Sequence, residues 1–329
     1  MDHLLSILRA AGDASRLRLL CILRRAELTV SELTQIVGQS QPRVSRHLKV
    51  LCDAGLLERF KEGSWVFYRM VESGIGAEFG QAILNLSPIC DDIFRGDQEC
   101  LDAVRRARAA TAAEFFKANA PDWERIRSLH APEKDVEAAI LRALAAAPID
   151  SILDVGTGTG RMLELCAPHI KHGIGIDLSA EMLTIARDRL ERIGANHCQV
   201  RLADLYRLRF RSATQEAGFD AALFHQVLHY LDDPQRAVAE VARVLKPGGR
   251  LIIADFAPHQ LEFLRVELAH RRLGFADREV ESWFAAARLD LVSAEAVAPS
   301  VDEVHSIDGK LTVKIWIAAK ASAIAQVAA

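Results

Sequence analysis

The chain has 329 residues, half of them apolar and about a quarter charged, with a formal net charge of -3. This composition is typical of a globular protein, and the length allows two domains. No apolar run is long enough to span a membrane, and charged residues near the N-terminus argue against a signal peptide. We therefore expect a cytoplasmic protein without a membrane partner. Six scattered cysteines without a C-x-x-C pair predict reduced thiols.

The N-terminal region is predicted to begin with three helices. Apolar residues at helical spacing indicate two helices within residues 3–27, separated at Gly12. A third helix starts at Thr29, which forms a capping box with Glu32, and it stops at Gly38. The segment is slightly basic, since residues 1–75 carry eleven Lys and Arg against eight Asp and Glu.

A fourth helix follows, with Ser40 as its predicted N-cap. Its faces differ in character: Val44, Leu48 and Leu51 form an apolar face, and Arg46 and Lys49 point the opposite way. Strand-like segments at 57–60 and 65–70 predict a hairpin beside it. Helix, turn, basic helix and hairpin together predict a winged helix-turn-helix. The predicted DNA contacts are Gln41, Arg43, Ser45, Arg46 and Lys49 on the helix, and Lys61, Ser64 and Arg69 on the wing.

The run from Ser40 to Leu51, followed by Ala54-Gly55-Leu56-Leu57, resembles the recognition helix and wing entry of the ArsR/SmtB family of regulators. The resemblance implies a homodimer that reads palindromic, double-stranded operator DNA. Many members sense metals through cysteines on the helix before the recognition helix. The matching residues 31–37 hold no cysteine, so we expect no metal site.

The next segment, residues 76–130, has a largely helical pattern. The stretch from Glu114 to Arg127 resembles the helices that cover the cofactor pocket in small-molecule methyltransferases. We therefore expect residues 1–75 to be the DNA-binding domain and 76–130 to be a helical linker that serves dimerisation and forms a pocket lid.

The C-terminal region opens with an apolar run that leads into glycines at alternate positions. Asp154, Gly156, Gly158 and Gly160 give the pattern D-x-G-x-G-x-G, in which the missing Cβ atoms allow a tight turn and close approach of a ligand. The pattern resembles motif I of the class I S-adenosylmethionine (SAM) methyltransferases. It departs from the G-x-G-x-x-G dinucleotide fingerprint.

Strand and helix patterns alternate after Ser151, which predicts a doubly wound, parallel α/β sheet with ligands at the carboxyl ends of its strands. Asp177 ends the second strand, where an acid is suited to chelate the ribose hydroxyls. The segments 219–234 and 244–250 resemble the ubiquinone/menaquinone-biosynthesis methyltransferases. The resemblance implies a seven-stranded, Rossmann-like domain over residues 131–320, with 321–329 as a tail.

The same resemblance implies SAM or S-adenosylhomocysteine (SAH) as cofactor, with Asp204 accepting a hydrogen bond from the adenine amino group and Leu205 against the ring. The predicted cofactor residues are Asp154, Gly156, Thr157, Gly158, Gly160, Asp177, Leu178, Met182, Asp204, Leu205, His225 and Gln226.

Three functions remain open at this point. The second domain methylates a small molecule, or it is a silent sensor through which SAM or SAH switches operator binding, or it methylates DNA. The last is disfavoured because the sequence lacks the N-P-P-Y and Pro-Cys motifs of base methylation. His225 and His229 are candidates for a general base, and packing against the cofactor explains them equally well.

Overall fold

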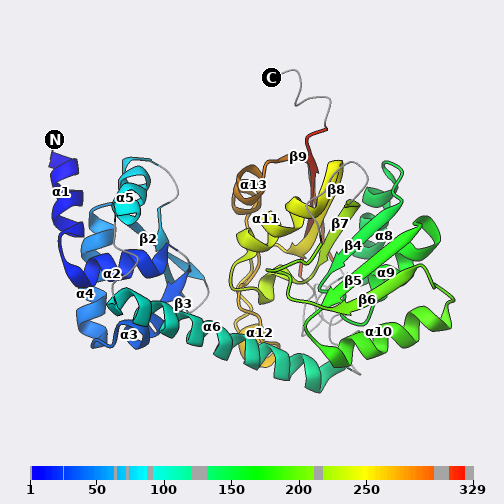
Figure 1. The fold of residues 1–329 in the computed structure, drawn as a ribbon, viewed down its shortest axis with the longest axis horizontal. Helices are drawn as coiled ribbons and strands as arrows, with labels where there is room; N and C mark the ends of the chain where they lie inside the picture. The colour runs from blue at the N-terminus through cyan, green and yellow to red at the C-terminus, as the bar shows by residue number, and fades with distance from the viewer. Residues whose placement is uncertain are drawn as a thin grey trace. The chain divides into compact units, whose positions relative to one another are not determined.

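The computed structural model describes residues 2–24, 26–62, 65–71, 74–86, 92–120, 132–210, 218–299 and 311–322. The chain forms two compact units, Met1–Thr111 and Ala112–Ala329 (Figure 1). Their boundary falls inside a long helix, α6 (Asp92–Asn119). Residues 92–111 of this helix thus belong to the first unit and residues 112–119 to the second.

The first unit is mostly helical. Its elements are α1 (Asp2–Ala11), α2 (Ala14–Leu23), β1 (Leu28–Thr29), α3 (Val30–Val37), α4 (Gln41–Asp53), β2 (Leu57–Glu62), β3 (Trp65–Met70), α5 (Gly74–Leu86) and the first part of α6. The predicted capping box is confirmed: the Thr29 side chain accepts from the Glu32 backbone, and the Glu32 carboxylate accepts from the Thr29 backbone. Ser40 caps α4 by position, without a side-chain hydrogen bond.

The wing is an antiparallel sheet in the order β1-β3-β2. Behind it, α2, α3 and α4 share one apolar core, to which α5 and α6 contribute Leu84, Leu101 and Val104. An ion pair strengthens this attachment, since Arg18 of α2 donates to both oxygens of the buried Asp97 of α6 at 2.6 and 2.7 Å. The N-terminal half of α6 is thus part of the first unit.

The second unit is built on a seven-stranded sheet in the order β6-β5-β4-β7-β8-β10-β9. The strands are β4 (Ser151–Val155), β5 (His172–Asp177), β6 (Cys198–Leu202), β7 (Phe219–His225), β8 (Leu245–Phe256), β9 (Leu289–Val297) and β10 (Val313–Lys320). Neighbours from β6 to β8 pair in parallel, whereas β10 is antiparallel to both β8 and β9. This confirms the predicted Rossmann-like class of fold.

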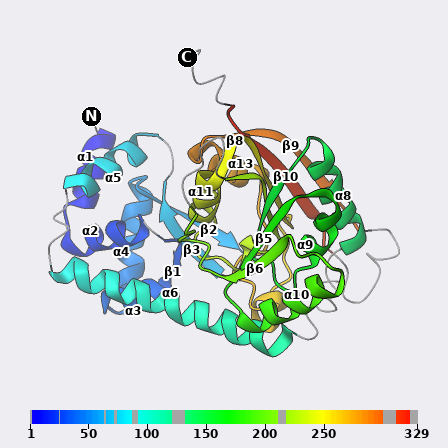
Figure 2. The ribbon, with the colours of Figure 1, turned by 45° about the vertical axis from the view of Figure 1, so that its right-hand side comes forward.

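Helices cover both faces of this sheet (Figure 2). They are α8 (Glu133–Ala145), α9 (Arg161–Cys166), η2 (Ala167–His169), α10 (Ala180–Arg192), η3 (Leu228–Tyr230), α11 (Pro234–Val244), α12 (Phe263–Glu267) and α13 (Asp277–Ala286). One core layer packs α11 and α13 on the sheet, and the other packs α8, α9 and the end of α10. Strand residues alternate between the layers, as Ala222 and Leu223 do, because side chains alternate across a strand.

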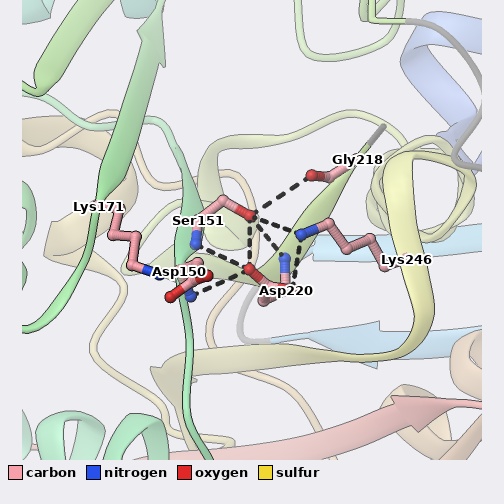
Figure 3. A network of polar contacts seen from close by, with 6 residues as sticks. All are labelled: Asp150, Ser151, Lys171, Gly218, Asp220 and Lys246. Atoms are coloured by element: carbon pink, nitrogen blue, oxygen red, sulfur yellow. Dashed lines mark hydrogen bonds and ion pairs between the residues drawn. The ribbon is translucent and has the colours of Figure 1, made fainter. Parts of the chain in front are cut away.

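A polar cluster ties the amino ends of three strands together (Figure 3). The Asp220 carboxylate of β7 accepts from the backbone and hydroxyl of Ser151 in β4 and from Lys246 of β8, each at 2.8 Å. Burial opposes ionisation of Asp220, but the hydrogen bonds from Lys246 and Ser151 lower its pKa overall. The cluster lies at the amino ends of the strands, away from the carboxyl ends where ligands bind, so we infer that it stabilises the fold.

None of the helices in the described part of the chain combines the length and the hydropathy needed to cross a membrane.

Candidate cofactor site and DNA-binding face

The glycine loop after β4 is held in a shape that requires its glycines. Gly156, Gly158 and Gly160 all have positive φ, at 71°, 53° and 79°. A Cβ atom on Gly156 would lie 2.5 Å from a Val227 methyl group, and one on Gly160 would lie 2.9 Å from the Ala186 Cβ. The loop therefore lies too close to Val227, which follows β7, and to Ala186 of the helix after β5 for a side chain at either glycine.

Two predicted cofactor residues, Asp154 and Thr157, support this loop from below. Both are buried, and the Thr157 hydroxyl donates to Asp154 Oδ2 at 2.6 Å. The backbone N–H groups of Gly156 and Thr157 donate to the Ile176 carbonyl at 2.8 and 2.9 Å. The first acid of the motif thus fixes the loop and has little surface to offer to a ligand.

Asp177, the predicted ribose acid, stands at the end of β5 beside the loop. Its Oδ2 accepts from the Gly158 backbone and its Oδ1 from the Ser179 backbone, both at 2.9 Å. Burial raises the pKa of Asp177, against the opposing effect of these backbone donors. Each carboxylate oxygen has a second lone pair, so the fixed carboxylate can still accept from two hydroxyl groups.

The residues after Asp177 differ in exposure. Leu178 is 62% exposed, whereas Met182, in the first turn of α10, is buried. Met182 packs with Ala120, which follows the end of α6, in a cluster with Phe115, Phe116, Ile185 and Tyr230. Leu178 therefore offers an apolar surface to a ligand, and Met182 supports the site from inside.

After β6, Asp204 is exposed, and its Oδ1 accepts from the Tyr206 backbone at 2.9 Å. The neighbouring Leu205 is buried in the apolar core, so the predicted contact with a base is limited to the small edge that it exposes.

The end of β7 carries the remaining predicted residues. His225 and Gln226 are buried, and Gln226 has a left-handed backbone with φ 56°, a strained conformation that is often found at functional sites. Its side-chain amide donates to Glu133 Oε1 at 3.0 Å.

The second candidate base, His229, has a partner that the sequence did not indicate. Its Nδ1 lies 2.7 Å from Asp255 Oδ1, and both residues are buried. Asp255 is the penultimate residue of β8, 26 residues further along the chain. A search for acids at strand ends would have found it, because it matches Asp177 in its place on a strand.

The α4 residues predicted to contact DNA lie opposite the buried face of this helix. Val44, Leu48 and Leu51 are fully buried, whereas Gln41, Arg43, Arg46 and Lys49 are exposed and Ser45 is half-buried. On the wing, Lys61 is exposed, and Ser64 lies outside the described residues.

Arg69, also predicted to contact DNA, is engaged within the first unit. Its guanidinium donates to Glu58 at 2.6 Å and Glu27 at 3.2 Å, and it lies over the ring of Phe60. Two carboxylates and an aromatic ring already engage this side chain, so we assign it to bracing the wing. The sequence could not show this because Glu27 is 42 residues away.

Comparison with known proteins agrees with both units. Residues 13–59 match the arsR family of bacterial regulatory proteins, and residues 153–253 match the methyltransferase domain family. The chain is 34% identical over 155 residues to a phosphatidylethanolamine N-methyltransferase of Cereibacter sphaeroides, covering 45% of this chain and 74% of that protein.

This chain covers a smaller share of the length of other relatives. The chain is 32% identical over 175 residues to an uncharacterized 37.1 kDa protein in transposon TN4556 of Streptomyces fradiae, covering 51% of this chain and 48% of that protein. It spans only 28% of the probable tRNA methyltransferase 9B of Bos taurus. A chain of the solved complex between the Haloferax volcanii Trm112 methyltransferase activator and a methyltransferase shares the fold, with a TM-score of 0.51, 23% identity and coverage of 63% of this chain and 97% of that chain.

The fold, the glycine loop and the family matches define the class. The chain belongs to the SAM-dependent methyltransferases of class I, and an arsR-family helix-turn-helix precedes its methyltransferase domain. SAM, or its product SAH, is accordingly the cofactor of the second unit.

Proposed function

We propose that this protein is a transcription regulator whose first unit binds operator DNA and whose second unit binds SAM and methylates a small molecule. The observation that carries the proposal is the loop at the end of β4, where the backbone of Gly158, which has positive φ, approaches the Asp177 carboxylate and fixes it together with the backbone of Ser179. Such a cradle suits a ligand that presents vicinal hydroxyl groups close to the backbone.

We assign the cofactor contacts to the exposed edge of this loop. Asp177 would hold the ribose hydroxyls, Leu178 would cover an apolar face, and Asp204 would accept from the adenine amino group. When bound, SAM supplies a methyl group on a positively charged sulfur. The residues of the chain would orient that methyl group and exclude water, since positioning accounts for much of the barrier lowering in such transfers.

The DNA-binding part of the proposal depends on α4. Its basic face projects away from the core, as insertion into a major groove requires. Arg43, Arg46 and Lys49 would contact base edges and phosphates, with Gln41 and Ser45 beside them and Lys61 on the wing.

The homodimer is supported by α1. This helix buries Ile7, Ala10 and Ala11 in the first unit, yet Leu4, Leu5 and Leu8 are 39%, 40% and 47% exposed. A short helix that is apolar on both faces gains stability by burying the second face. We infer that a second copy of the chain covers it, which would place two α4 helices about one helical turn of DNA apart.

The sensor function is the second candidate, and α6 favours it. The N-terminal half of α6 is held by Arg18 and by the core of the first unit. At its other end, the Phe116 ring lies 4.8 Å from the Tyr230 ring, in the same cluster as Met182. One helix therefore contacts the core behind the recognition helix and the cluster behind the cofactor loop.

Two measurements test the proposal as a whole. Calorimetry with SAH should show micromolar binding by the full-length protein, and selection from a random duplex library should yield a palindromic operator. NAD binding without SAH binding would contradict the cofactor assignment, and failure to enrich any sequence would contradict the operator.

Operator titration with SAM, with SAH and with neither separates the sensor from the enzyme. Couplings of about 1–3 kcal/mol, or roughly 5- to 150-fold in affinity, are typical of allosteric proteins. A shift of operator affinity in this range that disappears in Asp177→Ala would support the sensor function. Identical binding curves would leave methylation of a small molecule as the remaining function. Methyl groups incorporated into the operator would point instead to DNA methylation.

A further inference from the structure

The pair formed by His229 and Asp255 is organised in a way that the cofactor site does not require. Asp255 accepts the backbone N–H groups of Leu228 at 2.9 Å and Phe256 at 2.8 Å in addition to the His229 ring. Both Asp255 oxygens thus accept from backbone N–H groups, and a protonated ring nitrogen of His229 is the complementary third donor. The proton of the neutral imidazole then lies on Nδ1, and Nε2 carries the free electron pair.

The imidazole is also held in place by rings. The centroids of Tyr230, His270 and Phe256 lie 4.1, 4.2 and 5.1 Å from that of His229. The His229 carbonyl accepts from the backbone of Arg271 and Arg272, so the segment before α13 fixes the main chain as well. The His229 side chain retains 2% of its surface.

The place of the pair in the sheet indicates which part of the reaction it faces. Asp204 follows β6, Asp177 ends β5 and the glycine loop follows β4, so a cofactor bound by them would extend from adenine toward its sulfur in the order β6, β5, β4. The next strands are β7 and β8. His229 follows β7, and Asp255 is the penultimate residue of β8. The pair thus lies on the side where a methyl acceptor must approach.

We propose that His229 is the general base of methyl transfer, that Asp255 is its positioning residue, and that the acceptor reacts through a hydroxyl group. This inference rests on the proposed methyltransferase function. The acceptor oxygen forms a bond to the methyl carbon as the carbon–sulfur bond breaks and leaves its electron pair on sulfur. The hydroxyl proton passes to Nε2 of His229, and the Asp255 carboxylate stabilises the resulting imidazolium.

The other titratable groups that face His229 are consistent with this role. Burial, with a further contribution from the neighbouring His229, lowers the pKa of His259 to about 4, so His259 is neutral over the working range of a histidine base. His270 and Tyr230 contact the ring by their faces and edges, and Arg271 pairs with Asp232. Among the described residues of this cluster, Asp255 is the only carboxylate that pairs with the ring of His229.

A matched pair of substitutions separates catalysis from structure. In His229→Asn the amide nitrogen replaces Nδ1 and can still donate to Asp255, but no base remains. Asp255→Asn keeps the shape of the carboxyl group and removes the charge that fixes the tautomer. Full-length variants are compared with the native protein in thermal stability, in SAH affinity by calorimetry and in methylation of catechol by mass spectrometry.

We expect His229→Asn to keep its melting temperature and to bind SAH within about twofold of the native protein, while catechol methylation falls by about 100-fold or more. The native rate should rise with pH and level off, whereas the variant rate should keep rising because hydroxide replaces the base. The methylation rate of benzenethiol, which ionises without a base near neutral pH, should fall little in His229→Asn.

Imidazole nitrogen NMR gives a readout independent of activity. The native protein should show His229 protonated on Nδ1, and Asp255→Asn should lose this preference. The proposal is overturned if the proton lies on Nε2, if His229→Asn retains catechol methylation, or if the native protein binds SAH but methylates no hydroxyl probe. In that last case the cofactor assignment stands. Absence of SAH binding would contradict both the cofactor assignment and the role of His229 as a base.

Discussion

The two units hold their functional side chains in opposite ways. On α4 of the first unit, Arg43, Arg46 and Lys49 are exposed over a fully buried apolar face, and no ion pair within the described residues fixes them. In the second unit, Asp177 and Asp255 each accept hydrogen bonds from at least two backbone N–H groups. Exposed, hydrated Lys and Arg side chains suit binding to a polyanion such as DNA. Binding of a small ligand, or transfer of a proton, requires side chains that are already held in position.

The largest effect is expected where a fixed carboxylate is lost. Asp177→Ala removes two acceptors for the ribose and the partner of the Gly158 backbone, so SAH affinity should fall by roughly 1.5–3 kcal/mol. Calorimetry on the full-length protein measures this. Leu178→Ala is the matched control on the exposed neighbour and should cost less. Unchanged affinity in Asp177→Ala would exclude this acid from the site.

Loss of a mobile charge should have a comparable or smaller effect. Arg46→Ala should weaken operator binding by about 1–3 kcal/mol if the guanidinium contacts a base edge. Arg69→Met, in contrast, should leave operator affinity nearly intact and cost about 0.5–1 kcal/mol of stability through its ion pairs with Glu58 and Glu27. Anisotropy titrations and urea unfolding distinguish the two. Equal losses of operator affinity would show that Arg69 also binds DNA.

Acid should weaken the second unit through His259. Because the folded-state pKa is about 4 and the ordinary value is 6.5, the unfolded chain binds more protons between these values, so the free energy of unfolding falls as pH drops from 6.5 to 4. We expect a loss of about 1–2 kcal/mol, allowing for the partial exposure of the ring. Urea unfolding at pH 7 and pH 4.5 should show a smaller loss in His259→Asn; an equal loss would assign the acid sensitivity to other groups.

The smallest effect is a change in salt dependence. Lys49→Ala should lower the slope of operator affinity against salt by about one unit, since one fewer phosphate is neutralised. Titrations at four salt concentrations give the slope. Loss of discrimination between operator and random duplex, with an unchanged slope, would instead place Lys49 on a base edge.

Most of the fold could be predicted because it follows from local rules. Period-3.6 apolar spacing located α4 and its buried face, and alternating strands and helices predicted the parallel sheet. The segment Lys246–Gly249 contains Pro247 and two glycines, which are typical of a turn, yet it lies within β8, since Leu245 pairs with Phe219 across an irregular register. Pairing between distant residues decides such cases, and no local pattern records it.

The sequence predicted which residues form the candidate site, and the structure adds contacts and burial that the sequence did not indicate. Asp154 and Met182 fit the family pattern, but burial makes them supports for the loop and for the lid cluster. The partners of Arg69 and His229 lie far along the chain, so neither the bracing of the wing nor the pair with Asp255 was visible in a single segment. The division of the chain inside α6 likewise depends on packing at both of its ends.

We propose that the two units act as one regulator because α6 belongs to both. Hydrogen exchange of the full-length protein with and without SAH tests it directly. We expect SAH to slow exchange of backbone amides at residues 92–104, within the first unit. A seven-residue Gly-Ser insertion between Thr111 and Ala112 should abolish this protection, since such linkers are flexible. Protection confined to residues 112–320 in the native protein would contradict the claim.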